Sequence, residues 1–151
     1  MKYLINIKGI LILILMLVLV NDIFAGDRKV NWDAFSVNLV VAMKSKNPGL
    51  QQAAMQRIIQ YTDSLDITDA VYDIALIFGF HNNPKMRRLA MVTLSKINTN
   101  HSLNYLCRFL KFENNQAIRN QCCLIIRNYY VAKKPDKMDE LTTILTERVR
   151  N

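Results

Sequence analysis

Glycine and proline are scarce in this sequence, with 4 and 3 residues among 151. Both residue types interrupt helices, and disordered chains are often rich in them. Hydrophobic residues make up 51% of the chain, and no segment has the alternating pattern of a strand. The composition therefore favours a folded helical protein and argues against disorder. The length is typical of one domain, without a low-complexity segment.

Several motifs of catalytic and ligand-binding sites are also missing. The sequence has no glycine-rich phosphate loop and no strained serine turn. Four aspartates lie within 63–73 but lack the glycine and closing glutamate of a calcium loop, and Asp66 and Asp69 suit the first turn of a helix instead. His81 and His101 have no carboxylate or cysteine at catalytic or ligand spacing, so we expect solvated loop histidines. These absences predict no metal, no cofactor and no enzyme activity.

The one long apolar run, residues 10–20, is short for a membrane helix. It has eleven residues, it follows a basic start, and Ala25 lies shortly after it. A transmembrane helix needs about 20 apolar residues. The pattern is typical of a secretory signal peptide over residues 1–25, with an uncleaved anchor as the alternative. We therefore expect a mature chain of residues 26–151 that is periplasmic or secreted and has no transmembrane span after cleavage.

Basic residues exceed acidic ones in the expected mature chain. Removal of residues 1–25 leaves 18 basic and 11 acidic side chains. Outside the cytoplasm this excess favours acidic proteins, anionic surfaces or polyanionic glycans over nucleic acid as partners. A solvated basic surface without any partner is the simpler alternative. The oligomeric state is left open by the sequence.

A stretch of the chain occurs three times, starting at Asn47, Asn83 and Asn115, with spacings of 36 and 32 residues. This period is typical of helical solenoid repeats. The fourth, eighth and twelfth positions are apolar or small in every copy: Leu50, Ala54 and Ile58; Met86, Ala90 and Leu94; Ile118, Cys122 and Ile126. Their helical spacing predicts one buried stripe on each of three equivalent helices.

The start of each copy has the features of a helix N-terminus. The asparagine side chain is a good N-cap, and Pro48 and Pro84 occupy the first helical position, where a missing N–H costs nothing. The fifth position holds Gln51, Arg87 or Arg119. A cation in the first turn opposes the helix dipole, so we expect the two arginines to find partners outside their own helices.

These three stretches resemble the second helix of HEAT-family repeats, which are related to armadillo-type repeats. The signature of that helix is an acidic residue followed by Val, Arg, Ala and Leu at helical spacing. In the family, the arginine commonly bonds an acidic residue of the adjacent repeat and so builds a ladder along the stack. Here Asn47, Asn83 and Asn115 stand at the acidic position, which implies a weaker ladder. The resemblance covers roughly residues 31–150 and implies an all-α, short α-solenoid of HEAT-like hairpins.

Amphipathic segments divide the expected mature chain into about seven helices, as three hairpins and a final single helix. Short loops join them. The expected helices are 32–43, 48–61, 67–78, 84–97, 101–112, 116–131 and 138–145. Tyr129 continues the apolar stripe of the third copy, so we predict that it belongs to the core.

The three cysteines lie in one expected hairpin, formed by helices 101–112 and 116–131. Its turn is centred near Asn114, which sets Cys107 opposite residues 121–122. In an oxidising compartment a disulfide from Cys107 to Cys122 or Cys123 is therefore plausible, with one thiol left over. The alternative is plain core packing, because buried cysteines are common.

The exposed faces of the three equivalent helices give a candidate partner-binding surface. In HEAT-like stacks the second helix of each hairpin lines the concave side, and here these helices contain no acidic residue. The candidate residues are Arg57, Gln60, Arg88, Lys96, Asn120, Arg127 and Asn128. We expect a non-catalytic scaffold or adaptor that binds another, acidic protein through this surface. A basic envelope-associated structural protein that binds anionic glycan or lipid is the first alternative, and an enzyme on a HEAT-like scaffold is the second.

Overall fold

The computed structural model describes residues 30–149, and this part of the chain contains helices, turns and loops but no strand. The prediction of an all-helical chain with seven helices is confirmed for it. The α-helices are α2 (Trp32–Lys44), α3 (Pro48–Tyr61), α4 (Val71–Phe80), α5 (Pro84–Ile97), α6 (Asn100–Phe109), α7 (Gln116–Lys133) and α8 (Met138–Val149). Short 3-10 segments occupy Thr62–Ser64, Thr68–Ala70, Leu110–Phe112 and Pro135–Lys137.

The predicted signal peptide, residues 1–25, lies outside the described residues. The helices described here belong to one compact unit, Trp32–Asn151. Within residues 30–149, no helix is both long enough and apolar enough to cross a membrane.

One predicted helix start is wrong. We expected a helix from residue 67, but α4 begins at Val71, after the 3-10 segment Thr68–Ala70. The side chain of Asp66 accepts hydrogen bonds from the backbone N–H and the hydroxyl of Thr68, at 3.3 and 3.0 Å. Such local side-chain bonds offer the backbone an alternative to the α-helix. The aspartate therefore closes a turn ahead of the helix instead of sitting in its first turn.

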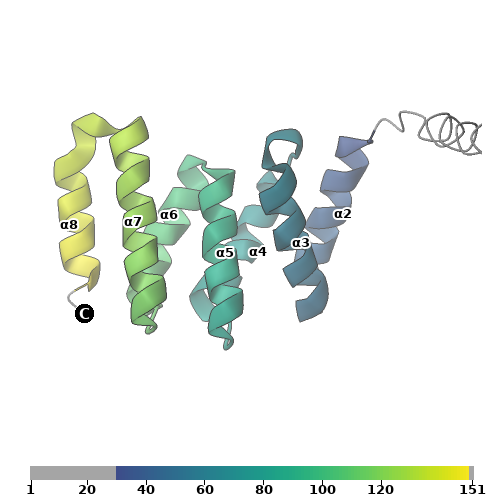
Figure 1. Cartoon of the computed structure of the whole chain (residues 1–151), viewed down its shortest axis with the longest axis horizontal. Helices are drawn as coiled ribbons and strands as arrows, with labels where there is room; N and C mark the ends of the chain where they lie inside the picture. Colours follow the sequence, from purple (N-terminus) through teal and green to yellow (C-terminus); the bar gives the residue numbers. More distant parts are fainter. Residues whose placement is uncertain (1–29, 150–151) are drawn as a thin grey trace, which may run out of the picture. The chain divides into compact units, whose positions relative to one another are not determined.

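The helices pack as hairpins that contact one another in two rows. Contacts join α2 with α3, α4 with α5, and α6 with α7, while α8 packs on α7. Further contacts connect α3 to α5 and α5 to α7, which we call the front row, and α2 to α4 and α4 to α6, which we call the back row. Figure 1 shows the front-row helices standing side by side, with α4 and α6 behind them. The three equivalent stretches of sequence are the front row.

The core lies between the rows, and the small eighth positions are at its centre. Ala54, Ala90 and Cys122 are all buried, as are the three residues at the twelfth position. The fourth position departs from the prediction, because Leu50 is 51% exposed while Met86 is buried. The helix that carries Leu50 is the first of its row, so no front-row neighbour covers it on that side.

The buried stripe of α7 runs through Tyr130, and the prediction that Tyr129 is core is confirmed only in part, because Tyr129 packs against the core without being fully buried. Steps of four residues lead from Ile126 to Tyr130, which is buried, whereas Tyr129 is half-buried. The hydroxyl of Tyr129 donates a hydrogen bond to Asn100 Oδ1 at 2.9 Å, at the start of α6. The tyrosine therefore ties α7 to the beginning of its hairpin partner.

A glycine allows the back-row helices α4 and α6 to approach closely. A Cβ atom placed on Gly79 would lie 3.0 Å from the ring of Phe109, which is closer than most real Cβ contacts, so the ring would have to shift. Phe109 in turn packs against Phe80 and Tyr105, with ring centroids 5.2 and 6.1 Å apart. The contact positions a strip of aromatic side chains along the back row.

Candidate functional site

The three front-row helices begin with the same cap. Asn47, Asn83 and Asn115 each accept, through Oδ1, a hydrogen bond from the backbone N–H two residues further on, at 2.9, 2.9 and 3.0 Å. Pro48 and Pro84 occupy the first helical position, as expected. The predicted asparagine caps are confirmed, and they fix where each helix starts relative to the loop before it.

The residue two places before each asparagine is part of the same loop structure. The asparagine N–H donates to the side chain of Ser45, His81 or Glu113, at 3.4, 3.0 and 2.7 Å. His81 lies in a loop, as expected, but it is half-buried and its Nδ1 accepts this bond. Because serine, histidine and glutamate differ chemically, the sequence alone does not reveal that these three positions are equivalent.

The side chain at the fifth position of each copy also forms a hydrogen bond with that residue. Gln51, Arg87 and Arg119 donate to the carbonyl oxygen of the residue two before the asparagine, at 2.7, 3.0 and 2.7 Å. The two arginines thus have partners outside their own helices, as expected. Side chains of different charge make the same backbone contact, so the three loops are structurally equivalent.

Glu113 is the buried centre of the third loop. Its carboxylate receives two hydrogen bonds from Arg87, Nε to Oε2 and Nη2 to Oε1, both at 2.8 Å. The side chains of Glu113 and Arg87 are 1% and 17% exposed. Glu113 belongs to the loop before α7 while Arg87 belongs to α5, so this ion pair joins two adjacent hairpins.

The surroundings of Glu113 keep its carboxyl group charged. Burial by itself would raise the pKa of Glu113, but the hydrogen bonds from Arg87 and from the Asn115 N–H, together with the charges of Arg87 and Arg119, outweigh it and lower the pKa. The hydrogen bond to Glu113 in turn raises the pKa of Arg87, against the effect of burial. Both groups are therefore ionised at neutral pH, and their polar atoms are used by one another and by the backbone. This arrangement joins the two adjacent hairpins through a buried, charged contact.

The three cysteines lie close to this network. Cys107 and Cys122 are buried, Cys123 is half-buried, and all three are thiols in the structure. Burial, followed by the nearness of Cys123, Cys107 and Glu113, raises the pKa of Cys122, so its reactive thiolate form is disfavoured. The disulfide between Cys107 and Cys122 or Cys123 stays a prediction, which mass mapping of the protein under non-reducing conditions decides.

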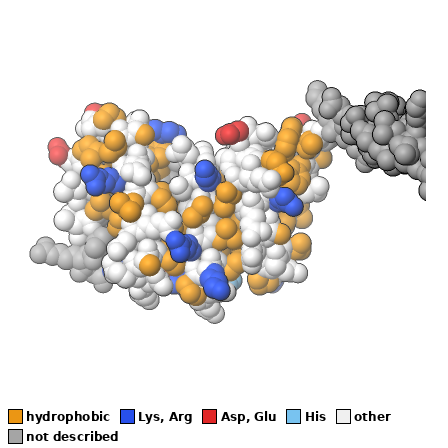
Figure 2. Space-filling view, viewed as in Figure 1, with side chains coloured by type: hydrophobic (Ala, Val, Ile, Leu, Met, Phe, Trp, Pro, Cys, Tyr) orange, Lys and Arg blue, Asp and Glu red, His pale blue; other side chains and the backbone are white. Residues whose placement is uncertain are grey.

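The seven residues of the predicted partner surface are all exposed and lie on the front row. Arg57 donates to Gln60 Oε1 at 2.9 Å, and Arg88 donates to Gln121 Oε1 at 3.0 Å, which links α5 to α7. We call this set of residues the cationic face: Arg57, Gln60, Arg88, Lys96, Asn120, Arg127 and Asn128. No aspartate or glutamate occurs in α3, α5 or α7. Figure 2 shows this side of the molecule with Lys and Arg across its middle and Asp and Glu toward its upper margin.

Comparison with known proteins assigns no family to the chain. No family model matches the sequence, and neither a curated protein nor a solved structure matches it. Among residues 30–149, no three His, Cys, Asp or Glu side chains are grouped in a way that could hold a metal ion. The loop network and the cationic face are therefore the features from which a function is inferred.

Proposed function

We propose that this protein is a non-catalytic binding scaffold that acts outside the cytoplasm and holds an acidic segment of another protein on its cationic face. The observation that carries the proposal is the charge of the front row. Its three helices expose Arg57, Arg88, Lys96 and Arg127 and contain no acidic residue. An acidic segment laid across them meets cations on every helix and no like charge, which favours fast association and correct orientation.

The architecture we propose is a short solenoid of HEAT-like hairpins. The support is the threefold recurrence of the loop contacts, with an asparagine cap, an acceptor two residues earlier and a donor at the fifth position. The bond from Arg87 to Glu113 of the next hairpin has the direction that the resemblance to HEAT repeats implies. Here the acidic partner precedes the capping asparagine by two residues instead of replacing it. Stacked repeats give an extended surface, which suits binding a segment of a partner.

Amide side chains make the cationic face selective as well as basic. Gln60, Asn120 and Asn128 are exposed beside the cations. An amide group both donates and accepts hydrogen bonds, so it pairs with the backbone of an extended segment. A surface of arginines and lysines alone would attract any polyanion, including lipid headgroups and glycans. The mixed surface therefore favours a polypeptide with acidic side chains.

A pull-down from the native extracytoplasmic fraction tests this function. The bait is the full chain, compared with the double variant Arg88→Glu and Lys96→Glu. The matched control is Arg108→Glu with Lys111→Glu, which makes the same charge change at exposed back-row positions. We expect partners that are captured by the wild type and the control, are lost with the front-row variant, and are released by salt.

Two other results would contradict the proposal. Partners that bind all three baits equally and without salt dependence would exclude the cationic face as the site. Anionic lipid vesicles or an anionic glycan that bind as tightly as the captured protein, and compete with it, would favour the envelope-associated alternative. Melting temperatures of the three baits serve as the check that each is folded.

A further inference from the structure

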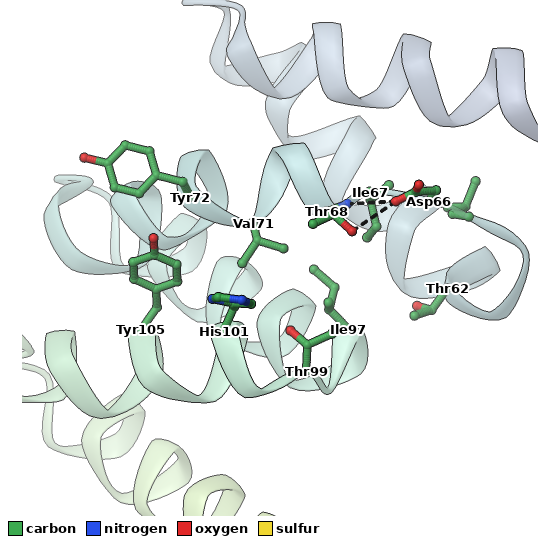
Figure 3. A pocket seen from close by; sticks show the side chains of 11 residues that line it. Thr62, Asp66, Ile67, Thr68, Val71, Tyr72, Ile97, Thr99, His101 and Tyr105 are labelled. Atoms are coloured by element: carbon green, nitrogen blue, oxygen red, sulfur yellow. Dashed lines mark hydrogen bonds between the residues drawn. The ribbon is translucent and has the colours of Figure 1, made fainter.

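A cleft lies on the back row, and no residue of the cationic face lines it. It has a volume of about 450 Å³ and lies between the segment 62–72 and the beginning of α6. Figure 3 shows Tyr72 and Tyr105 at one end of the cleft and Asp66 at the other. Its volume is within the range of about 300–1,000 Å³ of ligand-binding clefts in proteins.

One end of the cleft is apolar and aromatic. The rings of Tyr72 and Tyr105 have centroids 5.9 Å apart, and Val71 and Ile97 contribute aliphatic surface elsewhere along the wall of the cleft. Tyr72 is 54% exposed, so its ring is available to a ligand. Exposed aromatic surface at the mouth of a hollow suits an apolar side chain, because the contact removes both from water.

A second hollow adjoins the cleft, and Asp66 and Thr68 line both. The second hollow has a volume of about 370 Å³ and lies against α2. Its wall includes Val37 and Val41, which are 61% and 63% exposed. Two large aliphatic side chains exposed beside a hollow are typical of an interaction site. We call the two hollows together the back groove, and each is larger than a small amine requires.

Acidic groups line the middle of the back groove. Asp33, Asp66 and Asp69 all contribute to it, and none of them forms an ion pair with a described residue. Lys44 lines the second hollow and His101 the first, so the acids outnumber the basic side chains without being the only charged groups there. The carboxylate of Asp66 is held in place, because its Oδ1 accepts both bonds from Thr68. The backbone N–H of Asp66 also donates to Ser36 Oγ at 3.1 Å, which anchors the turn on α2. A fixed carboxylate between two apolar ends matches a cation flanked by apolar side chains.

We propose that the back groove binds an extended peptide segment of a partner protein, in which a basic residue lies between apolar ones. The basic side chain pairs with Asp66, one apolar neighbour packs on Tyr72 and Tyr105, and the other packs on Val37 and Val41. The charge of the chain argues against a second copy as the occupant, since a net charge of +8 makes two copies repel. This site is separate from the cationic face, and it requires a partner of the opposite charge.

Binding of short labelled peptides to the full chain tests this proposal. The probe is a peptide of alternating lysine and leucine, measured by fluorescence anisotropy, with a lysine–serine peptide and a glutamate–leucine peptide as controls. We expect Asp66→Asn and Tyr72→Ala each to weaken binding of the lysine–leucine peptide by about tenfold or more, and Val41→Ser to weaken it less. The matched control Asp63→Asn changes an exposed acid outside both hollows and should leave binding unchanged.

Each of the following outcomes would overturn the inference. Equal binding of the lysine–serine peptide would reduce the effect to general charge attraction, and equal weakening by Asp63→Asn would place the site elsewhere. Self-association that is lost in Asp66→Asn without any peptide would make a second copy the occupant. The double variant Arg88→Glu with Lys96→Glu should bind the lysine–leucine peptide as the wild type does, so failure at one surface is distinguishable from failure at the other.

Discussion

The two rows of helices follow different rules. Every helix of the front row begins with an asparagine cap, has a small buried residue at its centre and contains no acid. In the back row, α4 follows a 3-10 segment without a side-chain cap, while α6 begins with a capping box between Thr99 and Ser102. The front row is therefore regular and cationic, and the back row is irregular, with aromatic and acidic side chains along its groove.

The difference has a physical cause in the loops. The three loops that precede front-row helices use the same three contacts, so each helix starts at an equivalent place and presents an equivalent face. The segment before α4 instead makes a turn at Asp66 and a 3-10 segment, and a cleft lies between this segment and the start of α6.

The largest expected effect comes from removing the ion pair that joins two front-row loops. Glu113→Ala leaves Arg87 without its carboxylate and the Asn115 N–H without its acceptor. Breaking a buried ion pair from one side costs about 3–5 kcal/mol of the free energy of unfolding, and we expect a loss of that order in chemical denaturation. Glu113→Gln keeps part of the hydrogen bonding and should lower the free energy of unfolding by less.

The control for that prediction is Asp63→Ala. This change removes an exposed acid outside the three loops that precede the front-row helices, and it should change the free energy of unfolding by no more than about 0.5 kcal/mol. A double-mutant cycle with Arg87→Ala measures the coupling between the two side chains. Additive losses would show that the pair contributes no joint stabilisation and that the hairpins are held together by packing alone.

A smaller effect is expected from overfilling the centre of the front row. Ala90 is completely buried where α5 meets its neighbours, so Ala90→Leu should lower the free energy of unfolding by about 1–3 kcal/mol. Ala117→Leu makes the same change at an exposed position of α7 and should be nearly neutral. Equal melting temperatures for Ala90→Leu and the wild type would contradict the close packing at the eighth position.

The caps offer a direct comparison of the two rows. Asn115→Ala removes the cap of α7, and Thr99→Ala removes the cap of α6, so each should cost about 1 kcal/mol in the free energy of unfolding. Asn114→Ala, at an exposed neighbouring position, should have little effect. If Asn115→Ala changes the free energy of unfolding as little as Asn114→Ala does, the repeated cap does not stabilise the front row.

The weakest of the four effects is a dependence of stability on acid pH. Folding lowers the pKa of Glu113, so its contribution is complete above the unfolded value of 4.5 and is lost as the pH falls through the lower folded pKa. We therefore expect the stability difference between the wild type and Glu113→Gln to shrink as the pH falls below 4.5. A difference that is constant across this range would show that the charge of Glu113 does not stabilise the fold.

Local patterns were enough to predict the helices, the asparagine caps and the buried eighth position, because each depends on residues within a few turns of chain. The role of Glu113 was not predictable in this way, since its equivalents are a serine and a histidine and its main partner is 26 residues away. The exposure of Leu50 follows from its place at the end of a row. The back groove depends on how α2, the turn at Asp66 and the start of α6 meet, which no single segment encodes.

If the two rows bind segments of opposite charge, as we propose, one paired titration separates the two surfaces. The full chain is titrated with the glutamate–leucine peptide and with the lysine–leucine peptide, in the wild type, in Arg88→Glu with Lys96→Glu, and in Asp66→Asn. We predict that the front-row variant loses affinity for the acidic peptide alone, and that Asp66→Asn loses affinity for the basic peptide alone. Variants that weaken both peptides equally, or neither, would contradict the claim.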